Sequence, residues 1–389
     1  MTTGLYLSAT SPNSGKSLIA LGLADSLIKR ADRVGFFRPV FDGATIADDP
    51  VARLIREHFN LSEEQVGGAV SMNDALALIA EGDTEEISSR AVSAYEKVAA
   101  NSDVVIVDGA YLPANALAVE FDLNVQIARD LGLPVVAIVG AQEATVEEAV
   151  TAVDVARTEL LASKADLLAI IVNRAEPELR DEIEKSVKRG EADLPVYVLP
   201  EISELTAPTV GEVAEALKLD TAGVKAEDLS RDIHGIKVAA MTVSNFLGQF
   251  VDGDFVIVPG DRADIVAATL ASALAPSFPA PSGVLLTGGL DDVSGQHTAV
   301  GELIKNAPFP VLSTEHDTFK SARAVSRVHG SLESGHPRKL AAALGGWDEH
   351  VNKDELLSRL SIERPASMTP LRFLHNLIET ARANRRSVV

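Results

Sequence analysis

The sequence contains no cysteine and few aromatic residues. The absence of cysteine among 389 residues excludes disulfides, thiolate metal sites and a cysteine nucleophile. Aromatics make up only 4% of the chain although 46% of it is hydrophobic, a composition typical of α/β proteins whose buried parallel strands favour aliphatic side chains. The chain is longer than a domain with one ordinary hydrophobic core, so its length predicts two domains joined by a linker.

Basic residues are also scarce. The chain has 35 Lys and Arg against 56 Asp and Glu, for a net charge of −21, so we expect no nucleic-acid partner, which would need clustered positive charge. It has no run of about 18 apolar residues and no basic segment followed by an apolar core at its start. We therefore expect no membrane association and a cytoplasmic location. The eight histidines show no metal-ligand spacing.

Apolar segments alternate with helical patterns from the first residues onward. This alternation predicts a doubly wound, mostly parallel sheet with right-handed crossovers, whose strand ends gather at one edge. The acidic, serine-rich stretch 82–90 is predicted to be a solvated turn. The expected strands are Leu5–Ala9, Val34–Arg38, Val104–Val107, Val135–Val139, Leu167–Val172 and Val196–Leu199, and the expected helices are Asp74–Ile79, Val92–Ala99, Ala116–Leu131, Val146–Leu161 and Val210–Leu217.

A short polar loop after the first strand ends in Gly15-Lys16-Ser17, and an apolar helix follows at once. In such a loop backbone N–H groups point at a polyphosphate, Lys16 supplies a positive charge and the Ser17 hydroxyl binds a magnesium ion. The loop therefore predicts a site for ATP-magnesium or another nucleotide. The candidate residues are Thr10, Asn13, Ser14, Gly15, Lys16 and Ser17.

The loop departs from the full phosphate-binding pattern at one position. Thr10 stands where a glycine is expected five residues before Gly15, which limits access to positive φ and predicts a looser cradle or one shaped for another anion. The alternative is an ordinary helix start capped by Asn13 or Ser14. The order of strand, loop, lysine and hydroxyl favours the phosphate interpretation.

Two further strand ends supply candidate residues. Asp108 follows the expected strand 104–107, where P-loop proteins position an acidic group for magnesium, so Ser17 and Asp108 are the candidate metal ligands. A plain turn at Asp108-Gly109 is the alternative. Asn173 follows the expected strand 167–172 and could hydrogen-bond an adenine edge.

A second α/β unit is expected after an interruption of the periodicity at Leu217–Arg231. Two of its strands end in polar loops, which places Asp261, Arg262, Thr287, Gly288 and Gly289 at one sheet edge, in a crevice suited to a carboxylate or phosphate. The structural alternative is that Asp261 caps a helix, Arg262 pairs with an acidic neighbour and the glycines turn the chain. The expected strands are Ile236–Ala240, Phe255–Val258, Val284–Leu286 and Val311–Ser313.

These residues carry a resemblance to known families. The segments 260–265 and 283–289 look like the DRTGG domain, and the preceding part, with Gly15-Lys16-Ser17, Asp108-Gly109 and the run 198–210, resembles the dethiobiotin-synthetase-like P-loop domain. This order is similar to the N-terminal half of long-form bacterial phosphate acetyltransferase. The segment 368–389 looks like the start of that family's catalytic domain. The expected division is therefore a P-loop domain at 1–220, a DRTGG domain at 221–365 and a linker with a truncated catalytic domain at 366–389.

The resemblance implies a function and also its limits. It implies a regulatory and assembly region, a homo-oligomer and small-molecule effectors such as NADH, ATP or pyruvate. Coenzyme A would bind only in the catalytic domain, which this chain is expected to lack, so no residue here is assigned to catalysis. Arg38-Pro39 replaces the Lys-Pro pair of dethiobiotin-forming enzymes, and arginine does not lose its proton. Dethiobiotin synthesis is therefore not expected.

A second hypothesis stays open. The chain could be a self-contained P-loop ATPase or an ATP-dependent carboxylate ligase related to dethiobiotin synthetase. That hypothesis predicts magnesium-dependent ATP hydrolysis or ligation that is lost in Lys16→Ala. The first hypothesis predicts that the chain alone forms no acetyl phosphate.

Overall fold

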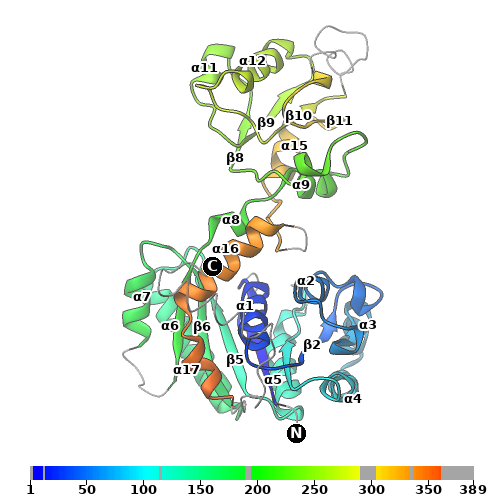
Figure 1. Ribbon diagram of the computed structural model, residues 1–389, viewed down its shortest axis with the longest axis vertical. Helices are drawn as coiled ribbons and strands as arrows, with labels where there is room; N and C mark the ends of the chain where they lie inside the picture. Colours follow the sequence, from blue (N-terminus) through cyan, green and yellow to red (C-terminus); the bar gives the residue numbers. More distant parts are fainter. Residues whose placement is uncertain are drawn as a thin grey trace, which may run out of the picture. The chain divides into compact units, whose positions relative to one another are not determined.

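The computed structural model describes residues 3–11, 14–113, 116–188, 194–289, 304–332 and 336–360. Contacts between residues divide the chain into two units. The first unit ends at Ile202 and resumes at Leu332, and the second runs from Ser203 to Ser331. Each unit is an α/β structure with its own sheet (Figure 1). None of the helices within these ranges is both long and apolar enough to span a membrane.

The first unit has a seven-stranded sheet within the described residues, and all its pairings are parallel. The strand order β3-β2-β4-β1-β5-β6-β7 places β1 and β4 side by side at the centre, which confirms the doubly wound prediction. The strands are β1 (Thr3–Ala9), β2 (Val34–Phe41), β3 (Val66–Ser71), β4 (Val104–Asp108), β5 (Val135–Gly140), β6 (Leu167–Ala175) and β7 (Val196–Pro200).

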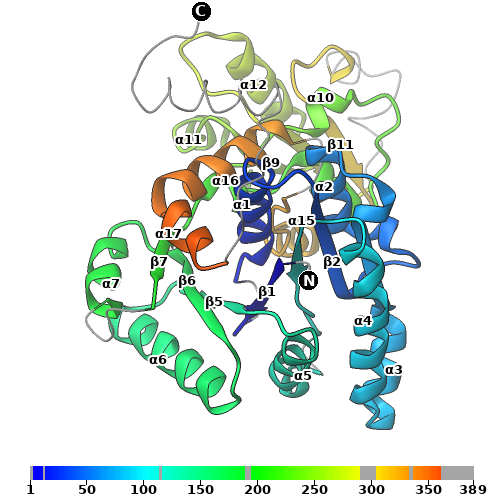
Figure 2. The same cartoon turned by 60° about the horizontal axis from the view of Figure 1, so that its bottom comes forward.

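Helices cover both faces of this sheet, and Figure 2 shows α1 and α16 on one side with α5 and α6 on the other. The central strands are buried along nearly their whole length, because helices exclude water from both faces. The helices are α1 (Lys16–Ile28), α2 (Pro50–Phe59), α3 (Met72–Glu81), α4 (Thr84–Ala99), α5 (Leu117–Asp130), α6 (Val146–Ala162), α7 (Arg180–Val187), α16 (Pro337–His350) and α17 (Lys353–Ser358), with short 3-10 turns η1 (Ile46–Asp48) and η2 (Glu63–Gln65).

Strand β3 was not predicted, and its glycines explain why. Two of its six residues are Gly67 and Gly68, which are poor strand formers when judged from sequence. A Cβ at Gly67 would lie 2.5 Å from the Val98 side chain, and one at Gly68 would lie 2.6 Å from that of Phe41. The glycines therefore permit close packing at the sheet edge, which only the folded structure reveals.

The predicted turn at 82–90 is wrong. Gly82 ends α3 in the left-handed conformation at φ 77°, and Asp83 caps α4 by accepting a hydrogen bond from Glu86 N at 3.2 Å. The acidic residues that suggested a solvated turn occupy the first turn of α4, where negative charge is favourable to the helix dipole.

The second unit contains a smaller parallel sheet in the order β11-β10-β9-β8. Its two faces pack into separate apolar clusters, one around Val256, Val258 and Phe246 and the other around Phe255 and Ile257. The elements are α8 (Ser203–Thr206), α9 (Val210–Leu217), α10 (Ala226–Leu229), β8 (Gly235–Val238), α11 (Val243–Leu247), β9 (Asp254–Pro259), α12 (Ala263–Leu274), β10 (Gly283–Thr287), β11 (Val311–Thr314) and α15 (Thr318–Val325).

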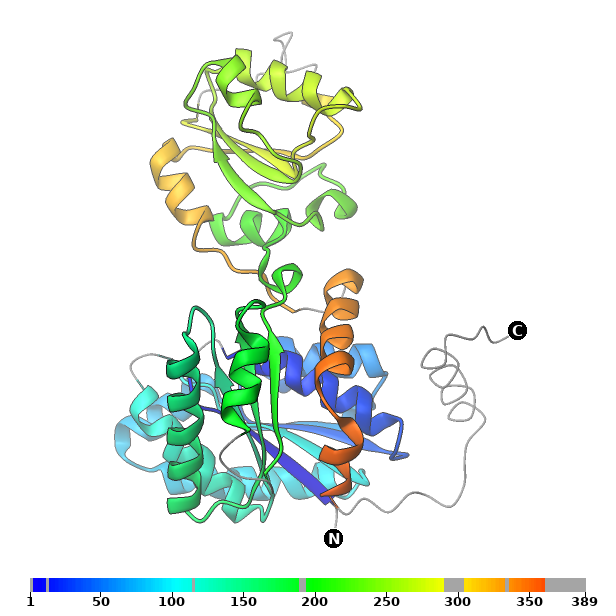
Figure 3. The same ribbon diagram turned by 90° about the vertical axis from the view of Figure 1, so that its left-hand side faces the viewer.

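The contacts between elements differ from the expected domain limits at 220 and 365. Helix α9 was expected in the first domain, but its Val210 and Val213 pack in the apolar cluster of the second sheet. Helices α16 and α17 were expected in the second domain, but α16 lies along α1 in the first unit (Figure 3). The expected catalytic-domain start at 366–389 lies outside the described residues.

One buried aromatic side chain fixes α16 to the first unit. The Trp347 side chain is fully buried, and its indole N–H donates to Ser26 Oγ at 2.9 Å. Its ring faces Gly22 of α1 so closely that a Cβ there would lie 2.2 Å from a ring carbon. The apolar contact and the satisfied indole N–H together attach α16 to the helix that follows the glycine-lysine loop.

Candidate phosphate-binding site

The loop between β1 and α1 presents an uncapped helix start. Helix α1 begins at Lys16 after Gly15, which has φ 74° and makes no side-chain cap hydrogen bond. The predicted alternative of a Ser14 cap is therefore wrong, and Asn13 lies outside the described residues. Since no side chain among the described residues caps this helix end, its first backbone N–H groups and the positive end of its dipole are available to an anion.

Thr10 and Asn173 anchor the loop from its two sides. Thr10 N donates to Ile138 O at 2.9 Å and its hydroxyl contacts the same carbonyl at 3.3 Å, so the residue that replaces the expected glycine ties the loop to β5. Asn173 Nδ2 donates to Ser14 O at 2.8 Å. Both residues therefore hold the loop, and the prediction that Asn173 contacts an adenine edge stays a prediction.

Gly15 is required by close packing as well as by its backbone angle. A Cβ at this position would lie 2.3 Å from Asn173 Nδ2, and positive φ is strained for any other residue. The loop backbone therefore passes directly against the end of β6. This arrangement fixes the last part of the loop before the lysine.

Lys16 lies against the carboxyl end of β4. Its Nζ is 3.1 Å from Asp108 Oδ1 and donates a hydrogen bond to Gly109 O. Burial lowers the pKa of Lys16, and the Asp108 carboxylate opposes that shift. Asp108 therefore lies beside the lysine at the central edge of the sheet, as the positions of their strands predict. This contact leaves open whether Asp108 also binds magnesium.

A buried arginine extends this charge cluster, which we call the 16–108–38–49 network. Arg38 Nε lies 3.6 Å from Asp108 Oδ2, and Arg38 Nη1 donates to Asp49 Oδ1 at 3.0 Å. Burial disfavours the charged guanidinium, but the Asp108 and Asp49 carboxylates raise the pKa of Arg38 above its usual range. Two cations and two carboxylates thus balance within a region that is nearly closed to solvent.

Asp49 joins this network to the start of α2. Its carboxylate accepts hydrogen bonds from Ala52 N and Asp42 N, each at 2.9 Å, in addition to the bond from Arg38. It is fully buried. Sequence reasoning did not find Asp49, although Asp followed by Pro50 is a helix-start signature; that signature predicts a cap and gives no indication of a buried ion pair.

Unused hydrogen-bonding capacity gathers at the ends of the central strands. Within the described residues, buried polar atoms without a hydrogen-bond partner include Arg38 Nε, Asp108 Oδ1 and Asn173 Oδ1. Asp108 Oδ1 faces Lys16 Nζ at ion-pair distance but outside hydrogen-bond geometry. Buried polar atoms are usually satisfied, so three such atoms on β2, β4 and β6 around one phosphate-type loop indicate a ligand or ordered water there.

The loop after β4 is held rigid by a second set of bonds. Asn124 Oδ1 accepts from Tyr6 Oη and from Ala110 N, both at 2.7 Å, and Asn124 Nδ2 donates to Ala110 O at 3.0 Å. A Cβ at Gly109 would lie 2.4 Å from Leu7 O. These contacts fix the backbone carbonyl that receives the Lys16 ammonium.

The residues present fit a nucleotide with magnesium. Ser17 follows Lys16 in the first turn of α1, and Asp108 Oδ1, which has no hydrogen-bond partner, lies 3.1 Å from Lys16 Nζ. Oxygen ligands of this kind suit magnesium, which keeps several waters and binds through one or two protein groups. Among the described residues no group of three or more His, Cys, Asp or Glu side chains could hold a metal by itself.

In the second unit the predicted crevice is largely satisfied by the protein itself. The Arg262 guanidinium binds both oxygens of Asp264, at 2.8 and 2.9 Å, and donates to Met241 O at 3.0 Å. Gly288 N donates to His316 O, just after β11, and Gly289 N donates to Thr314 O at the end of β11. The Thr287 hydroxyl lies 2.7 Å from that of Thr318.

Two details of the second unit bear on the sequence predictions. Helix α12 starts after Arg262 without a side-chain cap, so the predicted cap by Asp261 is wrong. The pairing of Arg262 with an acidic neighbour is observed. The two loops do meet, since Gly260 N donates to Thr287 O at 2.8 Å, and ligand binding by Asp261, Arg262, Thr287, Gly288 and Gly289 stays a prediction.

Comparison with known families agrees with the order of the two units. Residues 3–213 match the AAA domain family, which is more than half of the chain. The chain belongs to this AAA domain family. Residues 212–328 match the DRTGG domain, so the AAA domain precedes a DRTGG domain as the resemblance implied.

Proteins similar to the whole chain include ones named phosphate acetyltransferase. One from Nitratidesulfovibrio vulgaris is 34% identical over 406 residues, with 100% of this chain and 56% of that protein covered. One from Synechocystis is 26% identical, with 100% of this chain and 56% of that protein covered. The chain thus spans about half the length of the curated relatives it matches.

Solved structures with a similar fold over about half of this chain share little sequence identity with it. A complex of Cyanothece McdA with ATP has a TM-score of 0.35 and 13% identity, covering 52% of this chain and 85% of that chain. The septum site-determining protein MinD of Pyrococcus horikoshii, complexed with Mg-ADP, has a TM-score of 0.32 and 13% identity, covering 53% and 84%.

Proposed function

We propose that this chain is the N-terminal regulatory and assembly region of a cytoplasmic phosphate acetyltransferase, in which the AAA domain binds ATP-magnesium. The whole enzyme would interconvert acetyl-CoA and phosphate with acetyl phosphate and coenzyme A. The observation that carries the proposal is the match of the entire chain, across both units, to proteins with this name. Homo-oligomer formation and response to small-molecule effectors belong to the same proposal.

The site supports nucleotide binding by identifiable groups. The open start of α1 and the Lys16 ammonium would hold the phosphates, while Ser17 and Asp108 would hold the magnesium ion, which neutralises phosphate charge. Lys16 now contacts Asp108 and Gly109 O. Its ammonium would exchange these contacts for phosphate oxygens, and Arg38 would hold Asp108 in place.

Calorimetry with ATP-magnesium tests nucleotide binding. We expect heat of binding with the wild-type chain and its loss in Lys16→Ala, because Lys16 is the first residue of α1 and supplies a positive charge to the phosphates. Lys29→Ala is the matched control, since Lys29 ends the same helix and pairs with Asp25 at 2.7 Å. Absence of heat with the wild type, or equal binding by Lys16→Ala, would contradict the nucleotide assignment.

Two activity assays separate this proposal from the alternative. With acetyl-CoA and phosphate we expect the chain to form no acetyl phosphate, because none of its residues is assigned to acetyl transfer. With ATP-magnesium we expect binding without sustained hydrolysis. Robust acetyl phosphate formation would contradict the regulatory role, and magnesium-dependent ATP turnover that disappears in Lys16→Ala would identify a self-contained P-loop ATPase.

A further inference from the structure

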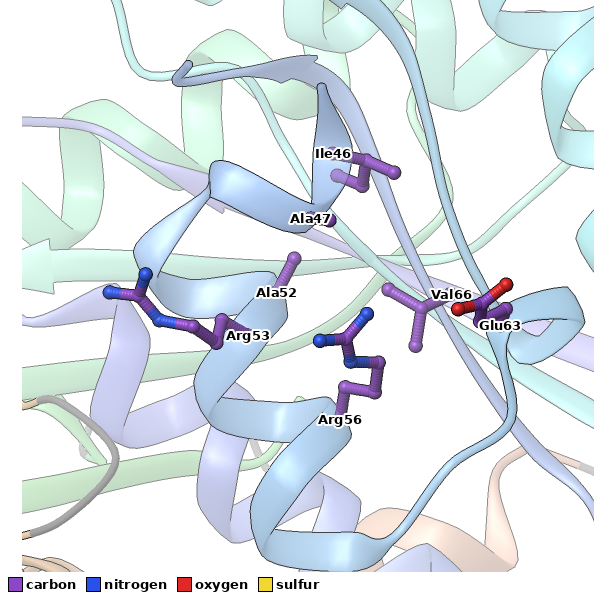
Figure 4. A pocket seen from close by; sticks show the side chains of 7 residues that line it. All are labelled: Ile46, Ala47, Ala52, Arg53, Arg56, Glu63 and Val66. Atoms are coloured by element: carbon purple, nitrogen blue, oxygen red, sulfur yellow. The ribbon is translucent and has the colours of Figure 1, made fainter. Parts of the chain in front are cut away.

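A small cavity lies on the first unit, away from the phosphate-binding loop. It has a volume of about 210 Å³ and lies between α2, the turns η1 and η2 and the start of β3 (Figure 4). None of its lining residues belongs to the 16–108–38–49 network or to the predicted nucleotide set. The lining residues are Ile46, Ala47, Ala52, Arg53, Arg56, Glu63 and Val66.

Two arginines on α2 give this cavity its charge. Arg53 and Arg56 are three residues apart and therefore lie on the same side of the helix. In Figure 4 the Arg56 side chain extends from α2 toward Val66 and Glu63, while the Arg53 guanidinium lies at the outer side of the helix. Arg56 is thus the cation inside the cavity, and Arg53 is at its edge.

Neither guanidinium forms an ion pair in the part of the chain that the structure describes, although Arg56 lies in the last turn of α2 and Arg53 acts weakly on Asp48. No side-chain hydrogen bond or ion pair within 4.0 Å involves Arg53, Arg56 or Glu63. Several other arginines of this unit do pair with carboxylates, for example Arg33 with Asp103 and Arg90 with Glu86. In a chain of net charge −21, half-buried arginines with no carboxylate within ion-pair distance indicate that an external anion can bind here.

The surrounding carboxylates limit what that anion can be. Asp48 lies near Arg53, but its carboxylate is held by Thr45, whose side chain and backbone N donate to it at 2.9 Å each. Those bonds, with a smaller contribution from Arg53, lower the pKa of Asp48. Glu63 lies across the cavity from Arg56 and repels a second anionic group, so a ligand with one anionic end is favoured over a polyanion.

The remaining wall is apolar and the volume is small. Ile46, Ala52 and Val66 line the space beside Arg56, and sites for larger drug-sized ligands occupy about 300–1,000 Å³. This lining suits a body of a few carbon atoms whose anionic end lies on the guanidinium. Arginine binds carboxylate and phosphate oxygens as a planar fork.

We propose that this cavity is a binding site for a small organic molecule with a single anionic group, a carboxylate or a phosphate monoester on a short carbon body, held by Arg56 with support from Arg53. Its helix α2 is capped by Asp49, which also binds Arg38 of the 16–108–38–49 network. The site is separate from the nucleotide site, and the proposal does not depend on nucleotide binding.

The test uses calorimetry with two small anions, sodium butyrate and glycerol 3-phosphate, each against a neutral analogue, butyramide and glycerol. Titrations use the whole chain carrying Lys16→Ala, so that the loop at α1 contributes no lysine to the binding of these anions. We expect saturable binding of at least one anion and none of its neutral analogue. Preference between the two anions identifies the carboxylate or the phosphate class.

Variants then place the binding in the cavity. Arg56→Gln should weaken binding by about tenfold or more, as loss of a charge-assisted hydrogen bond predicts, and Arg53→Gln by about two- to threefold because it lies at the edge. Arg90→Gln, an exposed arginine paired with Glu86, is the matched control and should leave binding unchanged. Circular dichroism of each variant verifies folding, and Arg56→Lys should restore part of the affinity through its charge.

Two results would overturn the proposal. One is that neither anion binds, or that each binds no better than its neutral analogue. The other is that folded Arg56→Gln binds the anion as tightly as Arg90→Gln does.

Discussion

The two sheets of this chain both end in polar loops, but they differ in whether the polar side chains there already have partners within the protein. At the first sheet the strand ends carry the buried Arg38 and Asp108, beside Lys16 at the start of α1 and unsatisfied polar atoms. At the second sheet Arg262 is 29% exposed and bound to Asp264 and a backbone carbonyl. Parallel topology brings polar loops together in both units, and among the described residues the unsatisfied buried polar atoms at the loop-bearing strand ends lie on the first sheet.

The largest expected effect comes from breaking the buried part of the first edge. Asp49→Ala should lower the free energy of unfolding of the first unit by about 3–5 kcal/mol for an uncompensated buried Arg38, and by about 1 kcal/mol more for the lost helix cap. Urea denaturation measures it. Asp264→Ala is the counterpart in the second unit and should have no measurable effect, because its pair with Arg262 is largely solvated. Similar losses in both variants would remove the contrast between the edges.

The next effect tests which residues belong to the first unit. Trp347→Ala should lower the free energy of unfolding by about 3–5 kcal/mol, because it leaves a cavity against α1 and removes the bond to Ser26. Phe319→Ala, at an aromatic residue that is 77% exposed, is the control. An unchanged urea midpoint for Trp347→Ala would contradict the assignment of α16 to the first unit.

A smaller effect concerns the loop itself. Asn173→Ala should weaken ATP-magnesium binding by about tenfold, because the loss of a buried hydrogen bond to Ser14 O leaves that carbonyl unpaired and loosens the loop. Calorimetry measures the affinity, and circular dichroism verifies the fold. Arg262→Gln should bind ATP-magnesium like the wild type, and a larger loss in Arg262→Gln than in Asn173→Ala would place the nucleotide in the second unit.

The pH dependence of nucleotide affinity gives the most gradual effect. Burial lowers the pKa of Lys16, and Asp108 opposes that shift. As the pH rises, the ammonium therefore loses its proton at a lower pH than an ordinary lysine does. ATP-magnesium affinity should therefore fall in that alkaline window, and in Asp108→Asn the fall should begin at lower pH. The free energy of unfolding should change in the opposite direction. Because the pKa of Lys16 is lower in the folded than in the unfolded chain, losing this proton as the pH rises removes the cost of burying the charge. Affinity that is constant throughout the window would contradict a role for the Lys16 charge.

Much of the fold follows from the sequence because each unit repeats short apolar strands and amphipathic helices. The predicted strands near residues 5, 34, 104, 135, 167 and 196 all form, and their shared edge follows from the handedness of the crossovers. Strand β3 did not follow, because Gly67 and Gly68 carry no β-propensity and are selected by the closeness of Val98 and Phe41. The acidic start of α4 was misjudged because the same residues suit a turn and a helix N-terminus.

Only the part of the site that follows a local sequence pattern could be predicted. Gly15, Lys16, Ser17 and Asp108 follow a local pattern of strand, loop and helix that any reader of the chain can find. Asp49 and the buried role of Arg38 depend on an ion pair whose partners are 11 residues apart and whose importance comes from burial. Arg53, Arg56 and Glu63 of the α2 cavity likewise follow no recognisable sequence pattern. The cavity forms only where the two 3-10 turns meet α2 in the folded chain.

The sequence by itself determined the family, the order of the two units and the glycine-lysine loop, because these are recorded in contiguous residues. Only the tertiary structure decided that Ser14 does not cap α1, that Asn173 contacts the loop backbone, and that Arg262 is bound by its own neighbours. It also placed α16 with the first unit through Trp347. These are questions of which polar and apolar groups remain unpaired after folding, and that balance depends on contacts between residues far apart in the chain.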